Sequence, residues 1–223
     1  MHTGKGLVKE LILRDGHRHA RIACPLNLIP SPGQYLLTGA ASDSPLPDPV
    51  YYTESAPEGF LASPAPDLWI PGMDLHLRGP LGRGFDLPAS ARKIALIDFG
   101  GSISRLRPLI KQALNQRAAV VLFTDLPADS LPDELEVQPL SAVSEIAQWA
   151  DWMAFEALRE NLHEVRERLG AQHQLPALQD AEILIRTPIP CGGAADCGVC
   201  AVTTKSGWRL ACRDGPVFRW SEV

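Results

Sequence analysis

Residues 191–218 read CGGAADCGVCAVTTKSGWRLACRDGPVF, and they hold four of the five cysteines in a chain of 223 residues. These are Cys191, Cys197, Cys200 and Cys212, in the pattern C-x5-C-x2-C-x11-C. A loop followed by a hairpin can bring four thiolates around one metal centre. The plant-type spacing for a [2Fe–2S] cluster is C-x4-C-x2-C with a distant fourth cysteine, so this pattern differs by one residue in the first gap. The spacing therefore predicts that the four cysteines hold a [2Fe–2S] cluster.

The glycines of the same stretch support this prediction. Gly192, Gly193 and Gly198 lie between the cysteines, and a glycine-rich loop can turn its backbone N–H groups toward the sulfides of a cluster without side-chain clashes. A four-cysteine zinc site usually pairs two C-x2–4-C knuckles, and only Cys197 and Cys200 form one here. The alternative interpretation is a scaffold without electron-transfer activity, in which the thiols bind zinc or sense redox state.

The composition excludes several classes of protein. Hydrophobic residues make up 45% and charged residues 21% of the chain, as in ordinary globular proteins. The net charge of −5 argues against nucleic acid, which needs a basic face. No apolar run approaches the roughly 20 residues of a membrane span, and MHTGKGLVKE (1–10) lacks the apolar core of a secretory signal. We therefore expect a cytoplasmic protein, in which reduced thiols favour metal binding over disulfides.

Residues 1–90 have the pattern of an antiparallel barrel. Short apolar stretches are broken by Pro and Gly, and Asp15-Gly16 predicts a turn between two of them. Many short strands with frequent turn signals predict a small antiparallel β-barrel. His17 and His19 flank the turn and are expected at the surface. The composition of residues 39–49 predicts a loop.

The pattern changes at residue 93. KIALIDFGG (93–101) is a continuous apolar run that ends in glycines, typical of a buried parallel strand. A helical spacing and a second buried strand follow, and an amphipathic helix is predicted over 157–170, ending at Gly170. Strand–helix alternation predicts a parallel α/β sheet. After a linker at 171–180, a strand leads into the cysteines, and residues 202–211 predict a hairpin.

Three stretches carry a resemblance to a known family. The pattern Cys-x-Asp-Gly-Pro-Val-Phe at 212–218 resembles the iron–sulfur electron-transfer subunit of type B dihydroorotate dehydrogenase, in the ferredoxin-reductase superfamily. GPLGRGF (79–85) is similar to that family's link between its first two domains, and PSPGQYLL (30–37) to its Pro-Gly-Gln-Phe segment. The resemblance implies an α+β multidomain chain, with a flavin-binding-like antiparallel β-barrel at 1–90, a reduced, Rossmann-like nucleotide-binding α/β domain at 91–175 and a [2Fe–2S] domain of cysteine loop and hairpin at 180–223.

The resemblance also implies contacts to FAD. The superfamily binds FAD through an Arg-x-Tyr-Ser/Thr motif, and the matching residues here are VYYT (50–53). Tyr52 and Thr53 would lie beside the flavin, whereas Val50 stands where an arginine would meet the diphosphate. Gly79 and Gly82, in the link between the domains, are further candidates for cofactor binding.

The nucleotide-binding turn differs more from the family. DFGGS (98–102) keeps only Gly100 and Gly101 of a turn that reads roughly Gly-Gly-Gly-x-Gly in relatives. The start of the following helix can still hold a phosphate group, and the alternative is a plain strand-to-helix turn. The Cys-Gly-Pro motif that borders the nicotinamide in relatives is absent.

The function implied by the resemblance is electron transfer through the cluster, between a flavin or nicotinamide group and a partner flavoenzyme. That partner would be a catalytic subunit similar to dihydroorotate dehydrogenase, which would place the chain in pyrimidine biosynthesis. The implied cofactors are the [2Fe–2S] cluster and FAD. The chain would then be an oxidoreductase subunit that is not catalytic on its own, and no catalytic residue is assigned. Homo-oligomers are a further expectation, with neither nucleic acid nor a membrane as partner.

Overall fold

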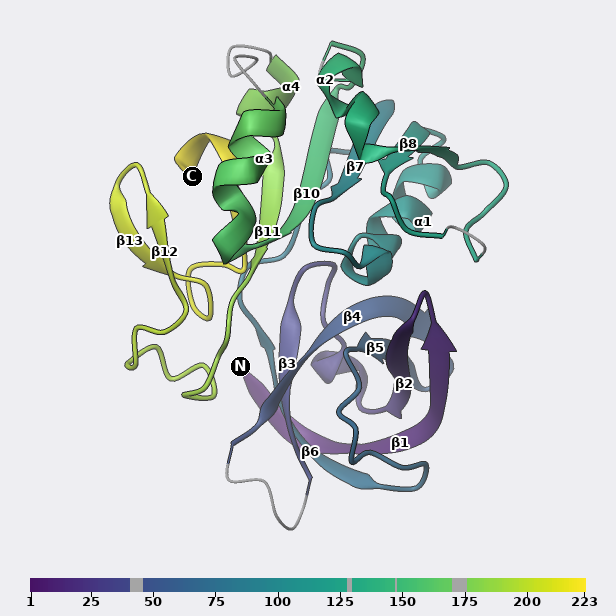
Figure 1. Ribbon diagram of the computed structural model, residues 1–223. Helices are drawn as coiled ribbons and strands as arrows, with labels where there is room; N and C mark the ends of the chain where they lie inside the picture. The colour runs from purple at the N-terminus through teal and green to yellow at the C-terminus, as the bar shows by residue number, and fades with distance from the viewer. Residues whose placement is uncertain (41–45, 128–129, 147, 170–175) are drawn as a thin grey trace.

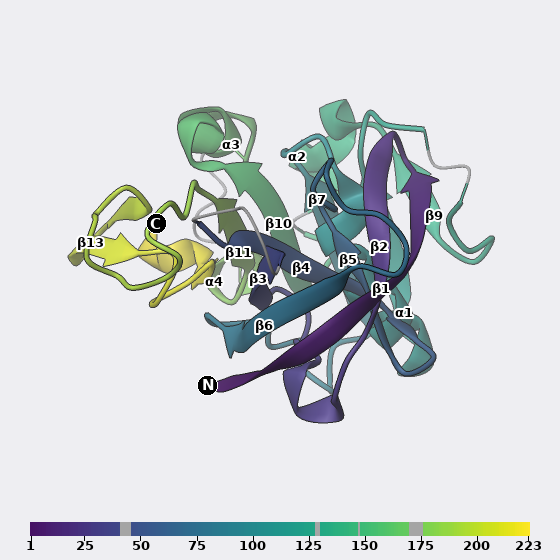
Figure 2. The same ribbon diagram turned by 90° about the horizontal axis from the view of Figure 1, so that it is seen from below.

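The computed structural model describes residues 1–40, 46–127, 130–146, 148–169 and 176–223. A β-barrel lies at one end of the strands of an α/β sheet, and a hairpin with its long loop lies beside both (Figure 1). Seen from below, this hairpin is on the opposite side of the molecule from helix α1 (Figure 2). The expected order of barrel, parallel sheet and cysteine segment is confirmed.

The barrel closes in the strand order β1-β2-β5-β4-β3-β6. Asp15 and Gly16, with φ of 52° and 73°, form the predicted turn between the first two strands, because a tight hairpin needs positive φ at both positions. The core of the barrel contains Val8, Ile22 and Phe60. The strands are β1 (His2–Arg14), β2 (His17–Ala23), β3 (Tyr35–Ala40), β4 (Asp48–Ala56), β5 (Gly59–Ser63) and β6 (Asp74–Leu81).

The second sheet has six strands in the order β14-β11-β10-β7-β8-β9. All neighbours are parallel except β14, which runs antiparallel to β11 at the edge. The predicted apolar run at 93–101 forms the central strand β7. The strands are β7 (Lys93–Asp98), β8 (Ala119–Phe123), β9 (Glu136–Gln138), β10 (Trp152–Leu158), β11 (Glu182–Arg186) and β14 (Val217–Arg219).

Helices cover both faces of this sheet. On β7, Ile94 and Leu96 join the core under α1, whereas Ala95 and Ile97 join the core under α3. The continuous apolar run from Ile94 to Ile97 is therefore buried on both sides, as expected for a parallel sheet. The helices are α1 (Arg107–Asn115), α2 (Val143–Ile146), α3 (Leu162–Leu169) and α4 (Pro176–Gln179), with short 3-10 turns at Leu26–Leu28, Ile103–Arg105, Leu140–Ala142, Arg159–Asn161 and Trp220–Glu222.

The cysteine segment (residues 187–216) is joined at both ends to strands of the α/β sheet. It leaves the sheet at the end of β11, forms the hairpin β12 (Ala201–Thr204) and β13 (Gly207–Leu210), and returns as the edge strand β14. Cys200 and Cys212 are part of the same core as Ile97 and Phe155 of the sheet. The predicted hairpin is confirmed, and the segment shares its core with the middle domain.

The predicted start of one helix and the predicted surface position of His19 were wrong. The helix predicted over 157–170 begins only at Leu162, because Ala157 and Leu158 pair with β11 as part of β10. His19 is fully buried rather than at the surface, since its ring packs at the junction of the barrel with Ser104.

Some predictions fall outside the described residues. The helix end at Gly170 does so, as do residues 41–45 of the predicted loop (39–49) and 171–175 of the predicted linker (171–180). In the described residues both were predicted too long, because β3 extends to Ala40, β4 begins at Asp48, and the linker region contains α4. In the described part of the chain, no helix has the length and apolar character needed to cross a bilayer.

Candidate metal centre

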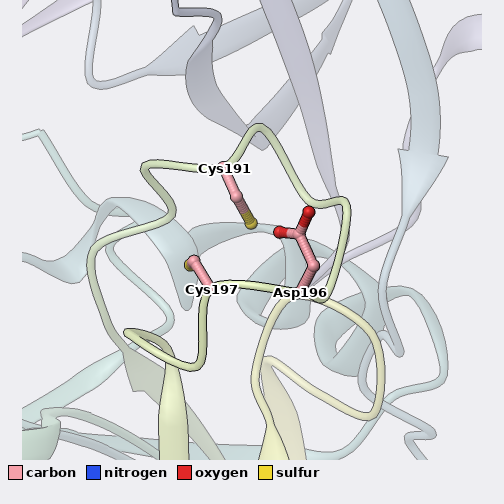
Figure 3. Close-up of side chains that lie close together, drawn as sticks. All are labelled: Cys191, Asp196 and Cys197. Carbon is pink, nitrogen blue, oxygen red and sulfur yellow. The ribbon is translucent and has the colours of Figure 1, made fainter.

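Among the described residues, the structure brings the thiols of Cys191 and Cys197 together with Asp196, in a group that does not include Cys200 or Cys212. Cys200 and Cys212 are buried, Cys191 is half-buried, Cys197 is exposed, and none is in a disulfide. The Sγ atoms of Cys191 and Cys197 and a carboxylate oxygen of Asp196 all lie within 4.8 Å of one another. In Figure 3 the Cys191 sulfur and the Asp196 carboxylate point toward each other across the loop.

Electrostatic coupling connects the exposed and the buried thiols. Desolvation opposes ionisation of Cys191, but a hydrogen bond with Cys197 and the backbone N–H groups of residues 194–196 lower the pKa of its thiol to about 7. Burial, a hydrogen bond with Cys200 and the negative charges of Cys200 and Cys191 raise the pKa of Cys212 to about 12. The positive charge of a metal cation among them would offset this mutual repulsion and keep the coordinated thiols deprotonated.

The backbone of the loop is shaped to present donors. Gly192, Gly193 and Gly198 have φ of 59°, 72° and 71°, and Ala195 has φ of 63°. Successive N–H groups in such left-handed turns converge on one side and form an anion-binding concavity. The N–H groups of residues 194–196 converge on Cys191 and would stabilise a thiolate there, whereas the Gly192 N–H donates to the carbonyl of Ile189. Donation from the three glycines to cluster sulfides stays a prediction.

Tyr35 of the barrel joins the three stretches that carried the family resemblance. It belongs to 30–37, its hydroxyl donates a 2.8 Å hydrogen bond to the Cys212 carbonyl, and a Cβ on Gly82 would lie 3.1 Å from its ring. Gly82 itself packs against Gly215, where an added Cβ would be 2.5 Å from the carbonyl oxygen. The link (79–85) and the Cys-x-Asp-Gly-Pro-Val-Phe stretch therefore pack on each other around one buried ring.

The candidate cofactor glycines of the link face protein atoms. A Cβ on Gly79 would lie 2.5 Å from a methyl group of Leu36, and Gly79 has φ of 151°. Gly82 is packed as described above. Close packing accounts for both glycines, and a cofactor contact by either stays a prediction.

The candidate flavin residues lie on β4. Val50 is in the barrel core. The Tyr52 hydroxyl shares a 2.7 Å hydrogen bond with Ser55, and the Thr53 hydroxyl donates to the Leu61 carbonyl at 2.9 Å. Tyr52 and Thr53 both line a cavity of about 570 Å³ between β4 and α1. This volume is within the range of small-molecule sites.

The turn at Gly100 and Gly101 is occupied by the protein's own carboxylate. Asp98 Oδ1 accepts hydrogen bonds from the N–H groups of Gly100 and Ser102, both at 3.0 Å. Arg186 donates to the Gly100 carbonyl. Backbone N–H groups that would hold a phosphate at such a turn are thus already paired, and a second negative charge there would meet Asp98.

A buried charge cluster beneath this turn was missed by the sequence analysis. Glu156, which is fully buried, pairs with Arg105 at 2.7 Å and with Arg186 at 3.0 Å. The Arg105 guanidinium lies over the ring of Tyr51, 4.7 Å from its centroid. The tyrosine that faces the junction with the α/β sheet is therefore Tyr51 rather than Tyr52. Glu156, Arg105 and Arg186 lie far apart in the sequence, so no sequence pattern predicted their ion pairs.

Comparison with solved structures identifies the class of fold. The chain is similar to the NADH-dependent reduced ferredoxin-NADP oxidoreductase structure, with a TM-score of 0.72 and 18% identity over 98% of this chain and 89% of that chain. It is also similar to the ferredoxin reductase in carbazole 1,9a-dioxygenase (TM-score 0.62, 18% identity, 76% of this chain, 65% of that chain). Ferredoxin-NADP+ reductase from Plasmodium falciparum gives a TM-score of 0.59 at 11% identity, over 82% of this chain and 95% of that chain. The chain therefore has the fold of the ferredoxin reductases.

The cysteine segment matches a particular domain family. Residues 191–223 match the family described as the iron-sulfur cluster binding domain of dihydroorotate dehydrogenase B, which confirms the predicted resemblance. No curated protein matches the sequence. The chain thus combines the fold of the ferredoxin reductases with a C-terminal segment that matches an iron–sulfur cluster binding domain.

Proposed function

We propose that this chain is an electron-transfer subunit whose [2Fe–2S] cluster, held by Cys191, Cys197, Cys200 and Cys212, connects a flavin or nicotinamide group with a partner flavoenzyme. The observation that carries the proposal is the placement of the four thiols in one segment, where Cys191 and Cys197 lie together and Cys200 and Cys212 are buried in the core shared with the sheet. All-sulfur donors with backbone N–H groups aimed at them suit an iron–sulfide centre. When bound, such a cluster accepts and releases single electrons.

The protein's own contribution is to hold and partly bury the sulfurs. Cys200 and Cys212 are fixed in the core shared with the sheet, whereas Cys197 is exposed at the surface. A centre with one buried and one exposed side can pass electrons to a docked partner without leaving its site. Single-electron exchange also suits a flavin, which can take up a pair of electrons and release them one at a time.

The partner and the second cofactor follow from the same proposal. The match of residues 191–223 to a domain of dihydroorotate dehydrogenase B favours a dihydroorotate dehydrogenase-like catalytic subunit as partner, a role in pyrimidine biosynthesis and a cytoplasmic location. FAD is retained as second cofactor because Tyr52 and Thr53 line a cavity between β4 and α1. Because Asp98 already binds the N–H groups of the turn after β7, FAD is favoured over a nicotinamide dinucleotide as the group that exchanges electrons with the cluster.

Anaerobic purification followed by iron, sulfide, zinc and flavin analysis tests the proposal. We expect two iron and two sulfide ions per chain, a brown protein, and an EPR signal after reduction. Stoichiometric zinc without iron would contradict electron transfer and support the scaffold alternative. Flavin is decided in the same sample, since FAD in stoichiometric amount supports the second cofactor and its absence removes FAD from the proposal.

A further inference from the structure

The barrel places a cation directly on the cysteine loop. Arg78 of β6 is half-buried, and its guanidinium donates to the carbonyl of Gly192. In the described part of the chain no carboxylate forms an ion pair with Arg78, although most arginines of the barrel have one. A half-buried cation that lacks an anionic partner indicates that another negative group completes its surroundings.

Two glycines of the loop leave room for this contact. A Cβ on Gly192 would lie 3.7 Å from Arg78 Nη2, and a Cβ on Gly193 would lie 3.8 Å from the same atom. The Cβ on Gly193 would also be 3.2 Å from the Tyr35 hydroxyl. Both glycines have positive φ, so the loop backbone itself, rather than its side chains, faces Arg78 and Tyr35.

Tyr35 contributes a neutral donor next to the cation. Its ring is fully buried, and its hydroxyl donates to the carbonyl of Cys212, one of the candidate ligands. Arg78 thus directs a positive charge, and Tyr35 the positive end of its O–H dipole, toward backbone carbonyls of the cysteine segment.

We propose that Arg78 and Tyr35, both from the flavin-binding-like barrel, are positioning residues that raise the reduction potential of the cluster. The inference rests on the proposed function, because it requires a cluster at the four cysteines. Reduction adds one negative charge, and a nearby cation and hydrogen-bond donor stabilise the more negative state. Asp196 faces the same thiols and acts in the opposite direction. The barrel therefore tunes the cluster in addition to its role in cofactor binding.

The size of the effect follows from Coulomb's law. At an effective dielectric constant of about 20, a unit charge roughly 10 Å away changes a one-electron equilibrium by on the order of tenfold. For one electron, tenfold is 59 mV. The loss of one neutral hydrogen bond changes the equilibrium less, by roughly threefold.

Spectroelectrochemical titration of the purified, cluster-loaded chain tests the inference. Arg78→Gln keeps a donor and loses the charge, so we expect the potential to fall by about 59 mV; Arg78→Lys keeps the charge and is expected to stay close to the parent. Arg18→Gln is the matched control, since Arg18 pairs with Asp67 on the barrel and the hydrogen bonds of its side chain among the described residues go to Asp67 and Trp69; we expect no change. Tyr35→Phe is expected to lower the potential by the smaller amount.

The outcomes separate this inference from the proposed function. A parent protein without iron and sulfide would contradict the proposed function itself. A loaded parent with Arg78→Gln and Tyr35→Phe both at the parent potential would overturn only the inference, as would an equal fall in Arg18→Gln. If Arg78→Gln does not retain iron, Tyr35→Phe and Arg78→Lys decide: a lowered potential in the first with an unchanged potential in the second supports the inference, and any other pattern overturns it.

Discussion

Asp196 lies beside the thiols of the cysteine loop, a position that the cysteine spacing did not predict. Its carboxylate shares the neighbourhood of the Cys191 and Cys197 sulfurs, yet it is exposed and lies within the same short loop. Four cysteines already satisfy a [2Fe–2S] cluster, so the carboxylate is surplus as a ligand. Its negative charge should instead oppose reduction.

Variants of the loop distinguish a ligand from a neighbour. We expect Asp196→Asn to keep the visible absorption of the cluster and to raise its potential, because a negative charge is removed while four sulfurs remain. Cys197→Ser should lose most of that absorption, because a serine hydroxyl is a poor substitute for thiolate. The measurement is the absorption spectrum with iron content; bleaching in Asp196→Asn would show that the carboxylate is a ligand.

His19 makes stability depend on pH. Burial, with the positive charges of Arg14 and Arg107, lowers the pKa of His19 to about 4. The unfolded chain takes up a proton near pH 6.5 whereas the folded chain does not. The free energy of unfolding should therefore fall as the pH drops from 6.5 to 4 and level off below that, with His19 responsible for about 3 kcal/mol at most.

Urea denaturation at pH 7 and pH 4.5 measures this dependence. Carboxyl groups also titrate in this range, so the comparison is with His19→Gln, which cannot take up the proton. We expect the loss of stability between the two pH values to be smaller in His19→Gln than in the parent. Equal losses in the two proteins would mean that His19 is charged in the folded state.

At the scale of elements, the strand-to-helix turn after β7 resembles a phosphate-binding turn, but the Asp98 carboxylate already occupies the position of the phosphate. The N–H groups of Gly100 and Ser102 are paired with Asp98. Burial raises the pKa of Asp98, against these hydrogen bonds. A phosphate at this turn would have to displace a carboxylate that already has its donors.

We therefore expect no saturable binding of NADH or NADPH in isothermal titration calorimetry at micromolar protein concentration. The physical reason is that the two donors are occupied and that Asp98 and Glu156 are acidic. ADP-ribose serves as the control, because it carries the same diphosphate without the nicotinamide and should also fail to bind. Saturable dinucleotide binding would contradict this account of the turn.

Elements with a strong local signal were predictable from the sequence. The turn at Asp15-Gly16, the apolar strand β7 and the hairpin β12–β13 follow from φ preferences and periodicity, and the structure confirms them. The helix predicted over 157–170 was wrong in its first turn, because pairing with β11 extends β10 to Leu158. Helical periodicity cannot reveal a strand whose partner residues are 28 positions away.

At the scale of the whole molecule, the order of the three parts was predictable and their contacts were not. The cysteine motif and the two glycine-containing stretches gave the resemblance, and the comparisons bear it out. That these stretches meet around Tyr35 depends on tertiary packing. The same holds for Glu156, Arg105 and Arg186, whose charges come from three separate segments and meet only in the fold.

This charge cluster connects the barrel to the sheet, and its loss should destabilise the whole molecule. Glu156→Ala leaves two largely buried arginines without their carboxylate, so we expect it to lower the free energy of unfolding by about 3–5 kcal/mol. Glu160→Ala, which breaks an exposed pair with Arg159, should cost less than about 1 kcal/mol. Chemical denaturation of both variants is the measurement. Similar small losses would show that the junction does not depend on Glu156.

The central claim is that one sulfur-bridged pair of irons is held by the thiolates of Cys191, Cys197, Cys200 and Cys212. X-ray absorption at the iron edge of the anaerobically purified protein tests it most directly. The account predicts a first shell made only of sulfur and one iron neighbour for each iron. Oxygen or nitrogen in the first shell, an isolated iron without an iron neighbour, or zinc in place of iron would contradict it.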